Sequence, residues 1–374
     1  MESKINLLDH SETKVLLYSR YLSIYLNVLS RSRIKNIYLF DLFCGEGIYA
    51  DGGKGSPIAA LECIKNHYYA NNETCPNIFV TFNDSENSKV EKGKLKVDRV
   101  KELASKIFTP TNVKIGYSKI EYEELIHKVI ERTNKMGDDE RALIFIDPWG
   151  YKEIDPEELK MLLVNTKTEV ILFLPVYFMS RFVNKSKGDL EYKGGEALRK
   201  FMSRLFDGLD NVPYVKNQKN FIYLVQEQFK KYLEVAYVDS FKIERENNNW
   251  FCVFFFTNNK KGFQKMLEAK WSIDKKRGSE FKLGDEVRVE IFNELEVSAY
   301  DQKVLKFLLS NDGATNSELL DFGLHNNFLP KHTKAVLDEL KKTRKIEIIS
   351  LDNKPAISYY IGNEERLVKI KIIQ

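Results

Sequence analysis

The chain has 374 residues, of which 43% are hydrophobic and 30% are charged, and its formal net charge is +4. This length exceeds that of one ordinary domain, and the composition excludes wholesale disorder and a fibrous repeat. The apolar runs are shorter than the roughly 20 residues that span a bilayer, and the acidic first residues lack the apolar core of a signal peptide. We therefore expect a cytoplasmic protein without membrane contact.

The four cysteines include no CxxC pair, so we expect reduced thiols and neither a metal site nor a disulfide framework. The net charge is too small to indicate nucleic acid by itself. Residues 260–282, however, carry eight basic and only three acidic side chains. This local excess, which includes Lys276 and Arg277, is a candidate contact for the phosphates of a nucleic acid.

Residues 13–29 place apolar side chains at helical spacing and predict an amphipathic N-terminal helix. Strand-like and helical segments then alternate, which is typical of parallel βαβ units in a doubly wound α/β sheet. The predicted strands are residues 37–42, 78–83, 113–117, 142–146 and 169–175, and the predicted helices are residues 56–70, 88–107, 122–135 and 156–164.

After residue 175 the alternation ends. Helices are predicted at residues 196–206 and 220–233, followed by an antiparallel hairpin of residues 236–244 and 250–257. A parallel sheet that ends in such a hairpin is the organisation of class I methyltransferases. We expect this Rossmann-like domain to cover residues 1–290, with a helical insertion at residues 180–235.

Residues 291–374 predict a small winged-helix-like domain of three helices and a two-stranded wing. Lys331, Lys341 and Lys342 lie on or beside its third helix and are candidate contacts for a nucleic acid. The predicted helices are residues 300–310, 315–322 and 331–342, the predicted wing strands are residues 346–351 and 356–361, and the apolar side chains that fill the core or dock the domain are Phe322, Leu324, Phe328 and Leu329.

The motif DLFCGEG, residues 41–47, follows the first predicted strand. Unpaired amides and a helix dipole make such a strand-to-helix turn suitable for a nucleotide-like ligand. Gly45 and Gly47 remove the Cβ atom where a ligand would approach, and Asp41 can receive a cation. The spacing lacks the pyrophosphate cradle of dinucleotide sites and suits S-adenosylmethionine, which carries a positive sulfonium. A plain turn between strand and helix is the alternative.

Three further strand ends carry polar or aromatic residues. Asp84 directly follows the second strand, from which an acid can bind both ribose hydroxyls, and Glu86 is the second candidate for this role. Tyr117 and Ser118 end the third strand and are candidate contacts for the adenine, although a loop without such a role fits equally well. Phe43, inside the first motif, is assigned to the cofactor site with them.

The fourth strand ends in FIDPWGY, residues 145–151. This stretch is similar to the (D/N)PP(Y/F/W) loop of amino methyltransferases, in which a carboxylate and a carbonyl accept hydrogen bonds from the target amine while the ring stacks on the base. We therefore predict Asp147, Pro148, Trp149 and Tyr151 as catalytic residues. Trp149 replaces the second proline of that pattern, which leaves the acceptor group open. A helix-capping role for Asp147 is the alternative.

Two segments flank this predicted crevice. The glycine-rich residues 50–57 contain Lys54, which can meet an anionic substrate if the loop closes, or can belong to a surface loop without a role. Lys14 and Tyr18, on the N-terminal helix, can cover the methionine end of the cofactor or simply pack.

These residues resemble those of the three-Cys-motif partner proteins. The likeness runs through DLFCGEGIYADGGKGSPIAALE, FIDPWGYKEI, ILFLPVYFMSRF and TNSELLDFGLHNNFLPKHTKAVLDELK, and it covers most of the chain. That family is regarded as methyltransferase-like, and its genes lie beside those of a three-cysteine protein similar to radical-S-adenosylmethionine enzymes. The resemblance implies a two-protein modification system.

Two functions remain open. The first is a methyltransferase that uses S-adenosylmethionine to modify nucleic acid, together with the three-cysteine partner that the resemblance implies. The second is a non-catalytic, methyltransferase-like module that binds nucleic acid or the partner protein. The acids at Asp84 and Asp147 favour the first, and Trp149 in place of a proline favours the second.

Overall fold

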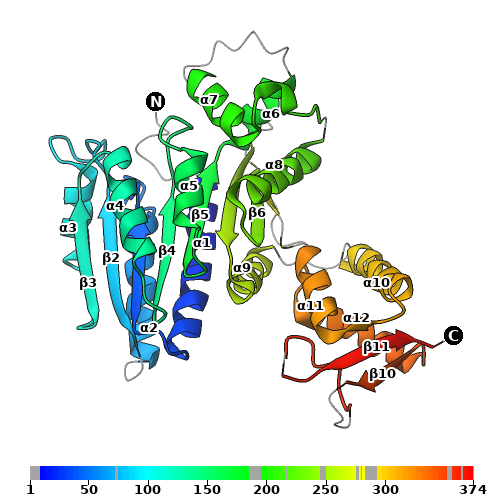
Figure 1. The fold of residues 1–374 in the computed structure, drawn as a ribbon. Coiled ribbons are helices and arrows are strands. Elements are labelled where there is room, and N and C mark those ends of the chain that lie inside the picture. The colour runs from blue at the N-terminus through cyan, green and yellow to red at the C-terminus, as the bar shows by residue number, and fades with distance from the viewer. Residues whose placement is uncertain are drawn as a thin grey trace. The chain divides into compact units, whose positions relative to one another are not determined.

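The structure is a computed structural model that describes residues 9–71, 75–184, 195–215, 217–244, 250–274, 278, 280–282, 293–351, 356–363 and 365–373. Its contacts divide the chain into two compact units. The first runs to Ala269 and includes the short strand β8, and the second begins at Lys270 and holds the C-terminal elements (Figure 1). Each unit is described by itself below.

The first unit alternates strands and helices, as the sequence predicts (Figure 1). Its elements are α1 (Asp9–Ser30), β1 (Asn36–Asp41), α2 (Ser56–Asn71), β2 (Asn77–Asn83), α3 (Lys96–Ala104), β3 (Val113–Ser118), α4 (Tyr122–Asn134), β4 (Glu140–Ile146), α5 (Pro156–Leu162), β5 (Thr168–Leu174), α6 (Val176–Asn184), α7 (Gly195–Leu205), the 3₁₀ turn η2 (Leu209–Asn211), α8 (Gln218–Leu233), β6 (Tyr237–Glu244), β7 (Trp250–Thr257), α9 (Lys260–Ile273), which extends into the second unit, and β8 (Glu280–Lys282).

The strands form one sheet in the order β3-β2-β1-β4-β5-β7-β6-β8. Strands β1 to β5 pair in parallel, whereas β7 is antiparallel to both β5 and β6. This confirms the Rossmann-like, class I methyltransferase fold with its antiparallel hairpin. From β1 the chain adds β2 and β3 on one side and then β4 and β5 on the other, so the strand order reverses between β1 and β4. The carboxyl ends of these two strands therefore flank the position where such sheets bind ligands.

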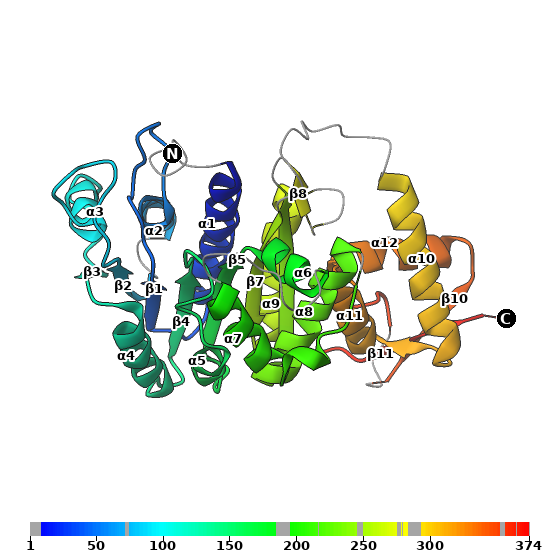
Figure 2. The same ribbon diagram turned by 90° about the horizontal axis from the view of Figure 1, so that it is seen from above.

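Helices cover both faces of the sheet, with α1, α2 and α3 on one side and α4 and α5 on the other (Figure 2). Side chains alternate along β7 because successive residues of a strand point to opposite faces. The rings of Phe254 and Phe256 lie 5.1 Å from that of Phe229 on α8, whereas the ring of Phe255 lies 5.0 Å from that of Tyr21 on α1.

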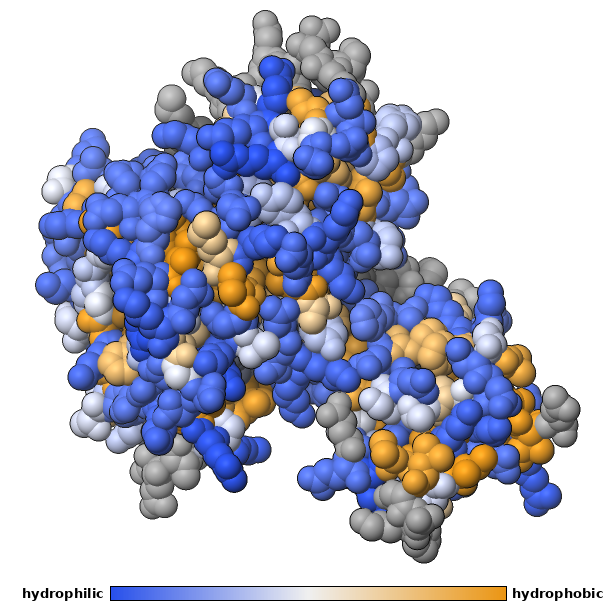
Figure 3. Space-filling view, in the orientation of Figure 1, coloured by the Kyte–Doolittle hydropathy of each residue, from blue (hydrophilic) through white to orange (hydrophobic). Residues whose placement is uncertain are grey.

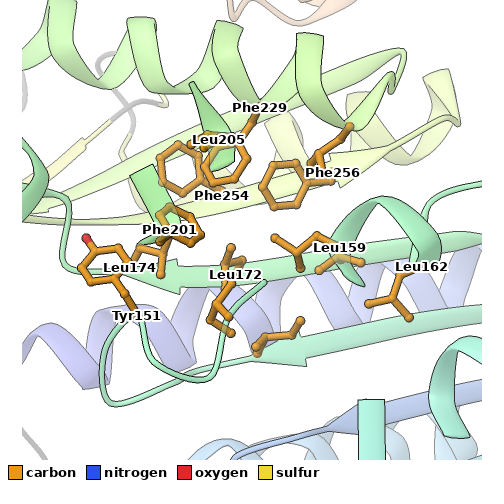
Figure 4. Packing of buried hydrophobic residues seen from close by; sticks show 14 of the residues in the cluster. Tyr151, Leu159, Leu162, Leu172, Leu174, Phe201, Leu205, Phe229, Phe254 and Phe256 are labelled. Carbon is orange, nitrogen blue, oxygen red and sulfur yellow. The ribbon is translucent and has the colours of Figure 1, made fainter. Parts of the chain in front are cut away.

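The main hydrophobic core lies between the sheet and helices α5, α7 and α8, where Leu159, Leu172, Phe201 and Phe254 are completely or almost completely buried (Figure 4). Burying each such side chain stabilises the unit by about 1.5–3 kcal/mol.

The surface in Figure 3 is mostly hydrophilic, and its apolar residues form scattered groups. Within the described part of the chain, no helix is long and apolar enough to cross a membrane. All four cysteines are free thiols.

The helix predicted over residues 88–107 is wrong in its first half, because α3 begins only at Lys96. Ser88 donates its hydroxyl hydrogen to Oε2 of buried Glu46 at 2.7 Å, and the Lys89 amide donates to Oε1 of the same carboxylate at 2.7 Å. Gly93 has a φ of +86°, which a helix does not allow. Long-range bonds to Glu46 therefore replace the helix that local periodicity favours.

Helices α6 and α9 are not among the predicted elements. The stretch predicted as a helical insertion, residues 180–235, contains α7, η2 and α8, whereas α6 begins before it, at Val176. The boundary predicted at residue 290 falls within residues 283–292, which lie outside the described residues. The predicted division at that position stays a prediction.

The second unit is a three-helix domain with a small antiparallel sheet of order β10-β11-β9. A capping box of Thr315 and Glu318 starts its second helix. This arrangement confirms the predicted winged helix. Its elements are α10 (Asn293–Ser310), β9 (Ala314–Thr315), α11 (Asn316–His325), α12 (Pro330–Lys342), β10 (Ile346–Ser350) and β11 (Val368–Ile372).

The second wing strand is not residues 356–361, as predicted, but β11. Tyr359 turns inward, is 3% exposed and donates its hydroxyl hydrogen to the Leu337 carbonyl at 3.0 Å. Tyr360 has a φ of +52°, which interrupts an extended chain. Val368 and Ile370 alternate with lysines, and both are fully buried. One face of β11 therefore packs against the core of the second unit.

The apolar side chains predicted to fill or dock the second unit fill its core. Leu324 and Leu329 are buried, and Phe322 and Phe328 pack against the same cluster. The ring of Phe328 stacks on Tyr300 with centroids 3.8 Å apart. These side chains therefore contribute mainly to folding of the domain.

Candidate active site

The carboxyl ends of β1, β2 and β4 place three acidic residues in one region. Asp41 is the last residue of β1, and Asp84 and Asp147 directly follow the neighbouring strands β2 and β4. Burial is the largest cause that raises the pKa of Asp41 from 3.8 to about 7. The charges of Asp147 and Asp84 act in the same direction, whereas hydrogen bonds from the Ser56 hydroxyl and the Phe43 amide lower the pKa. The three carboxyl groups thus interact electrostatically, as neighbouring strand ends predict.

Asp41 has one carboxylate oxygen bonded and one free. Its Oδ2 accepts a hydrogen bond from the Ser56 hydroxyl at 2.6 Å, and the residue is 1% exposed. Among the described residues, Oδ1 has no hydrogen-bond partner although it is buried. Leaving such an oxygen unsatisfied costs about 1–3 kcal/mol, so a ligand that donates a hydrogen bond here recovers that cost.

Glycine is required at two positions after β1, for partly different structural reasons. Gly45 and Gly47 have φ values of +66° and +74°, which favour glycine at both positions. A Cβ atom on Gly47 would lie 3.1 Å from side-chain carbons of Val100 and Leu103, so Gly47 is also needed for packing on this region of the chain around α3. A Cβ atom on Gly45 would lie 3.2 Å from the hydroxyl oxygen of Tyr49 instead.

Tyr49 is a site residue that sequence reasoning missed. Burial raises the pKa of its phenol, and the charges of Asp147, Glu46, Asp84 and Asp41 raise it further. Its hydroxyl therefore faces the acidic region from the glycine-rich loop. The loop turns back at this point, because the Gly52 amide donates to the Tyr49 carbonyl at 3.0 Å. An aromatic residue two positions after the second glycine was the signal for it.

Asp84 already uses both carboxylate oxygens. Oδ2 accepts from the Gly45 amide at 3.0 Å, and Oδ1 accepts from the Glu86 amide at 2.9 Å. The ammonium group of Lys96 lies 3.5 Å from Oδ2. Burial still raises the pKa of Asp84, since it outweighs Lys96 and these hydrogen bonds. Asp84 thereby fixes the glycine loop to the end of β2.

Trp149 reaches from the β4 loop to the end of β2. Its side chain is 62% exposed, and its indole Nε1 donates to Glu86 at 3.1 Å. The ammonium nitrogens of Lys89 and Lys96 lie 4.7 and 5.1 Å from the ring centroid. Lys96 also forms an ion pair with Glu86. Burial tends to raise the pKa of Glu86, but the positive charge of Lys96 outweighs it, so the pKa is lowered. Glu86 is thus a half-exposed, ionised carboxylate at the edge of the site.

Helix α1 covers the end of β4. The ammonium group of Lys14 forms an ion pair with Asp147, and the two side chains are 6% and 24% exposed. The Tyr18 ring stacks on Phe145 at 4.5 Å. Asp155, rather than Asp147, caps α5 by accepting from the Glu157 amide, so the helix-capping alternative for Asp147 is wrong.

Two predicted site residues point elsewhere. Tyr151 is 4% exposed, donates its hydroxyl hydrogen to the Pro175 carbonyl at 2.9 Å, and packs on Phe201 in the main core (Figure 4). The Phe43 ring stacks on Tyr122 with centroids 5.1 Å apart. The Tyr151 ring is therefore part of the core and does not have the predicted contact with substrate, whereas the partly buried Phe43 ring packs against the same core. Pro148, between Asp147 and Trp149, is buried.

The end of β3 is joined to the site through its backbone. The Ser118 carbonyl accepts from the Asp84 amide at 3.3 Å. Tyr117 is half-buried, with its ring 6.2 Å from that of Phe82 and 6.0 Å from the ammonium nitrogen of Lys101. Tyr117 therefore keeps an aromatic surface beside the site.

The predicted substrate lysine of the first unit is engaged within the protein. Lys54 is half-exposed and forms a 2.7 Å ion pair with Glu62 on α2. An exposed pair of this kind is weak, about 0–1 kcal/mol, so it does not prevent Lys54 from exchanging to another anion. Lys276 and Arg277 lie outside the described residues.

Helix α12 carries a basic face. Lys331 and Lys334 line a hollow of about 230 Å³ beside Tyr359 and Tyr360, and the ammonium nitrogen of Lys341 lies 5.7 Å from the Tyr359 ring. Helical spacing places these three lysines on one side of α12. Lys342, eleven residues after Lys331, lies close to the same side at the end of the helix, and its ammonium nitrogen lies 3.9 Å from Glu339.

Comparison with known proteins agrees with the second unit. Residues 274–353 match the family model described as "GMT-like wHTH domain". No curated protein matches the chain. Among solved structures, it is similar to "Loganic acid methyltransferase with SAH" at 10% sequence identity and a TM-score of 0.27, over 98% of this chain and 94% of that one. We draw nothing from a similarity with so low a TM-score.

The order of helices and strands in the second unit agrees with the matched model, which describes a winged helix-turn-helix domain. The first unit has a methyltransferase-like fold by its own strand order. Residues 274–353 are therefore similar to a GMT-like winged helix-turn-helix domain, and this match supports the resemblance of the chain to the three-Cys-motif partner proteins.

Proposed function

We propose that the first unit binds S-adenosylmethionine at the carboxyl ends of β1, β2 and β4, and that the protein is a methyltransferase acting on nucleic acid. One observation carries the proposal. The buried, unpartnered Oδ1 of Asp41 lies at the position where a Rossmann-like sheet binds its ligand, among the charges of Asp84 and Asp147. A cationic ligand that donates a hydrogen bond fits this group.

Several residues would hold the cofactor. Asp41 would receive its positive charge, Gly45 would allow close approach beside Tyr49, and Glu86 rather than Asp84 would bind the ribose hydroxyls, because Asp84 already accepts two backbone hydrogen bonds. Tyr117 and Ser118 remain the proposed contacts for the base. When bound, S-adenosylmethionine supplies an electrophilic methyl group.

The chain's own residues would orient the acceptor. Asp147 would accept a hydrogen bond from the nucleophilic group of the substrate, which first requires it to loosen its ion pair with Lys14. The exposed indole of Trp149 offers a face on which a base can stack, at about 1–3 kcal/mol per base. Holding the two reacting groups in line would supply much of the rate.

Asp41→Asn is expected to weaken binding of S-adenosylmethionine about tenfold or more at pH 8. The amide can still accept from Ser56, but it places an NH₂ group where the carboxylate Oδ1 meets a cation. Because Asp41 has a pKa of about 7, it is mostly protonated at pH 6 and must lose that proton to receive the cation. Wild-type affinity should fall about tenfold between pH 8 and pH 6 through this group.

Isothermal titration calorimetry of the full chain at pH 6, 7 and 8 measures both effects. The amino group of the ligand titrates equally with the wild type and with Asp41→Asn, so any difference between the pH profiles of the two proteins is due to Asp41. Asp51→Asn makes the same charge change on an exposed residue of the neighbouring loop and should leave the affinity unchanged. Equal affinity and equal pH profiles for Asp41→Asn and the wild type would refute this site.

We also propose that α12 holds the nucleic acid, since winged helices commonly place their third helix against DNA. Changing Lys331, Lys334 and Lys341 to Glu is expected to weaken binding of duplex DNA at least tenfold at low salt. Each lost phosphate contact should lower the slope of log affinity against log salt by about 0.9. Fluorescence anisotropy of a labelled duplex over a salt series gives both quantities.

The matched control for this variant changes Lys219, Lys230 and Lys231 of the first unit to Glu. Its net charge is the same, but its altered residues lie on α8 or at its start. Similar losses in both variants would mean that binding follows total charge alone, which would contradict a role for α12. RNA of the same sequence in parallel titrations distinguishes the two nucleic acids.

A non-catalytic binding module is the second candidate. The Lys14 ion pair neutralises Asp147, and Trp149 spans to Glu86 at the site where a cofactor would lie. Both contacts favour a closed crevice that transfers no methyl group. Calorimetry with S-adenosylmethionine decides between the two, because a module of this kind would give no binding heat while still binding DNA. The three-cysteine partner is a proposal that rests on the resemblance alone.

A further inference from the structure

A second cavity lies at the opposite edge of the same sheet. It has a volume of about 310 Å³ and is lined by α1, α9 and the first residues of β4 and β5. Arg141 belongs to its wall and lies six residues before Asp147, which is about 20 Å along a strand. The cavity is therefore separate from the crevice assigned above, and its size is at the lower end of ligand sites in proteins.

Positive charge dominates the polar wall of this cavity. Five basic residues line it, against the acids Asp138 and Glu169. Lys167 is paired with Asp138 at 3.0 Å, and Lys265 with Glu268 at 2.7 Å. Three cations remain without an acidic partner within the described part of the chain, namely Arg33, Arg141 and Lys261.

Arg141 makes no ion pair among the described residues, although its charge acts on the carboxyl groups of Glu169 and Asp138. Its Nη1 donates to the carbonyl oxygens of Asp138 and Glu140 at 2.8 and 2.6 Å, which fixes the guanidinium without neutralising it. Glu169, the buried acid of the wall, is 6% exposed and accepts a hydrogen bond from Tyr21. Burial raises the pKa of Glu169 to about 7, so it contributes less than a full negative charge at neutral pH.

The other wall is apolar and aromatic. Helix α1 contributes Tyr21, Tyr25, Val28 and Leu29 to it. Tyr25 is 6% exposed, and its hydroxyl group is buried without a hydrogen-bond partner among the described residues. Glu169 and Arg141 both act on the pKa of this phenol, so the hydroxyl faces the charged wall. A buried hydroxyl of this kind is costly unless a ligand satisfies it.

We propose that this cavity binds a small soluble phosphate monoester with an aromatic or apolar body. The three positive charges of Arg33, Arg141 and Lys261 match a dianion better than a single carboxylate, and guanidinium groups bind phosphate through paired hydrogen bonds. Tyr21, Val28 and Leu29 cover the body of the molecule, and the Tyr25 hydroxyl bonds to the phosphate or its ester oxygen. The site is independent of the proposed methyltransferase activity.

The probe is 1-naphthyl phosphate, titrated by calorimetry into the full chain at pH 7.5. We expect saturable binding at one site, with inorganic phosphate and 1-naphthol each binding at least tenfold more weakly. Lys261→Glu, at an exposed position, should weaken binding at least tenfold, and Tyr25→Phe at least threefold. Glu169→Gln should strengthen it, because the variant loses the one buried negative charge of the wall.

The control is Lys231→Glu, an equal charge change on exposed α8, which should bind as the wild type does. A saturating amount of S-adenosylhomocysteine should not displace the probe, and this separates the outcome from that of the proposed cofactor site. Absence of saturable binding up to millimolar probe would overturn the proposal. So would equal affinity for all four variants, or equal affinity for the phosphate ester and 1-naphthol.

Discussion

Asp147→Asn is expected to lower methyl transfer by about 100-fold or more and also to destabilise the first unit by about 2–3 kcal/mol. The rate falls because the amide oxygen of Asn accepts the hydrogen bond of the acceptor group more weakly than a carboxylate does and cannot take up the proton that this group releases. Stability falls because Lys14, whose side chain is 6% exposed, loses its counter-charge and stays buried. Transfer of tritiated methyl groups from S-adenosylmethionine to nucleic acid, and urea unfolding, measure the two losses.

A second variant separates the two roles of Asp147. In Lys14→Met with Asp147→Asn, both charges of the ion pair are removed while similar side-chain volume is kept. We expect this double variant to regain most of the lost stability, because no buried charge is left unpaired, and to remain inactive. Recovery of methyl transfer along with stability would mean that Asp147 has only a structural role, and the catalytic assignment would then be wrong.

Asn316→Asp is expected to unfold the winged helix-turn-helix unit partly, at a cost of about 3 kcal/mol or more. The Asn316 side chain is 1% exposed, and its Nδ2 donates to the carbonyls of Tyr360, Asn363 and Arg366 at 3.2, 3.0 and 2.8 Å. Aspartate has nearly the same shape, but it directs a negative oxygen at three carbonyl oxygens.

Hydrogen exchange followed by mass spectrometry tests this prediction within the intact chain. Peptides from α11 and α12 should exchange much faster in the variant, while those from the first unit keep their protection. Asn311→Asp is the control, because Asn311 is exposed and makes one comparable bond, to the Phe307 carbonyl at 2.7 Å. Unchanged protection of α11 in Asn316→Asp would contradict the role given to this side chain.

Most of the fold could be predicted because local pattern and tertiary structure agree along β1 to β5. Each of these strands is an apolar run, and the helices between them are amphipathic, so alternation alone indicates a parallel sheet. Local pattern and tertiary structure disagree where one side chain forms hydrogen bonds with residues far away in the sequence. Glu46 fixes Ser88 and the Lys89 amide, and the resulting loop replaces two turns of the predicted helix.

The candidate site could be predicted only in part for a similar reason. Position at the end of a strand indicated Asp41, Asp84 and Asp147, because neighbouring strand ends must meet. The direction in which a side chain points depends on the residues that pack around it, and a short sequence motif does not specify these residues. Tyr151 and Phe43 belong to the motifs but turn into the core, whereas Tyr49 follows the motif and turns toward the acids.

Helix α1 runs lengthwise beside the strands of the parallel sheet and contacts both the carboxyl end of β4 and the first residues of β5 (Figure 1). Near its beginning Lys14 neutralises Asp147, and a few turns later Tyr21 bonds to Glu169. A shortened protein that started at β1 would therefore leave Asp147 without Lys14 and Glu169 without Tyr21, at opposite ends of the strands. Residues 9–30 are an integral part of the fold, and any shortened form of this chain has to retain them.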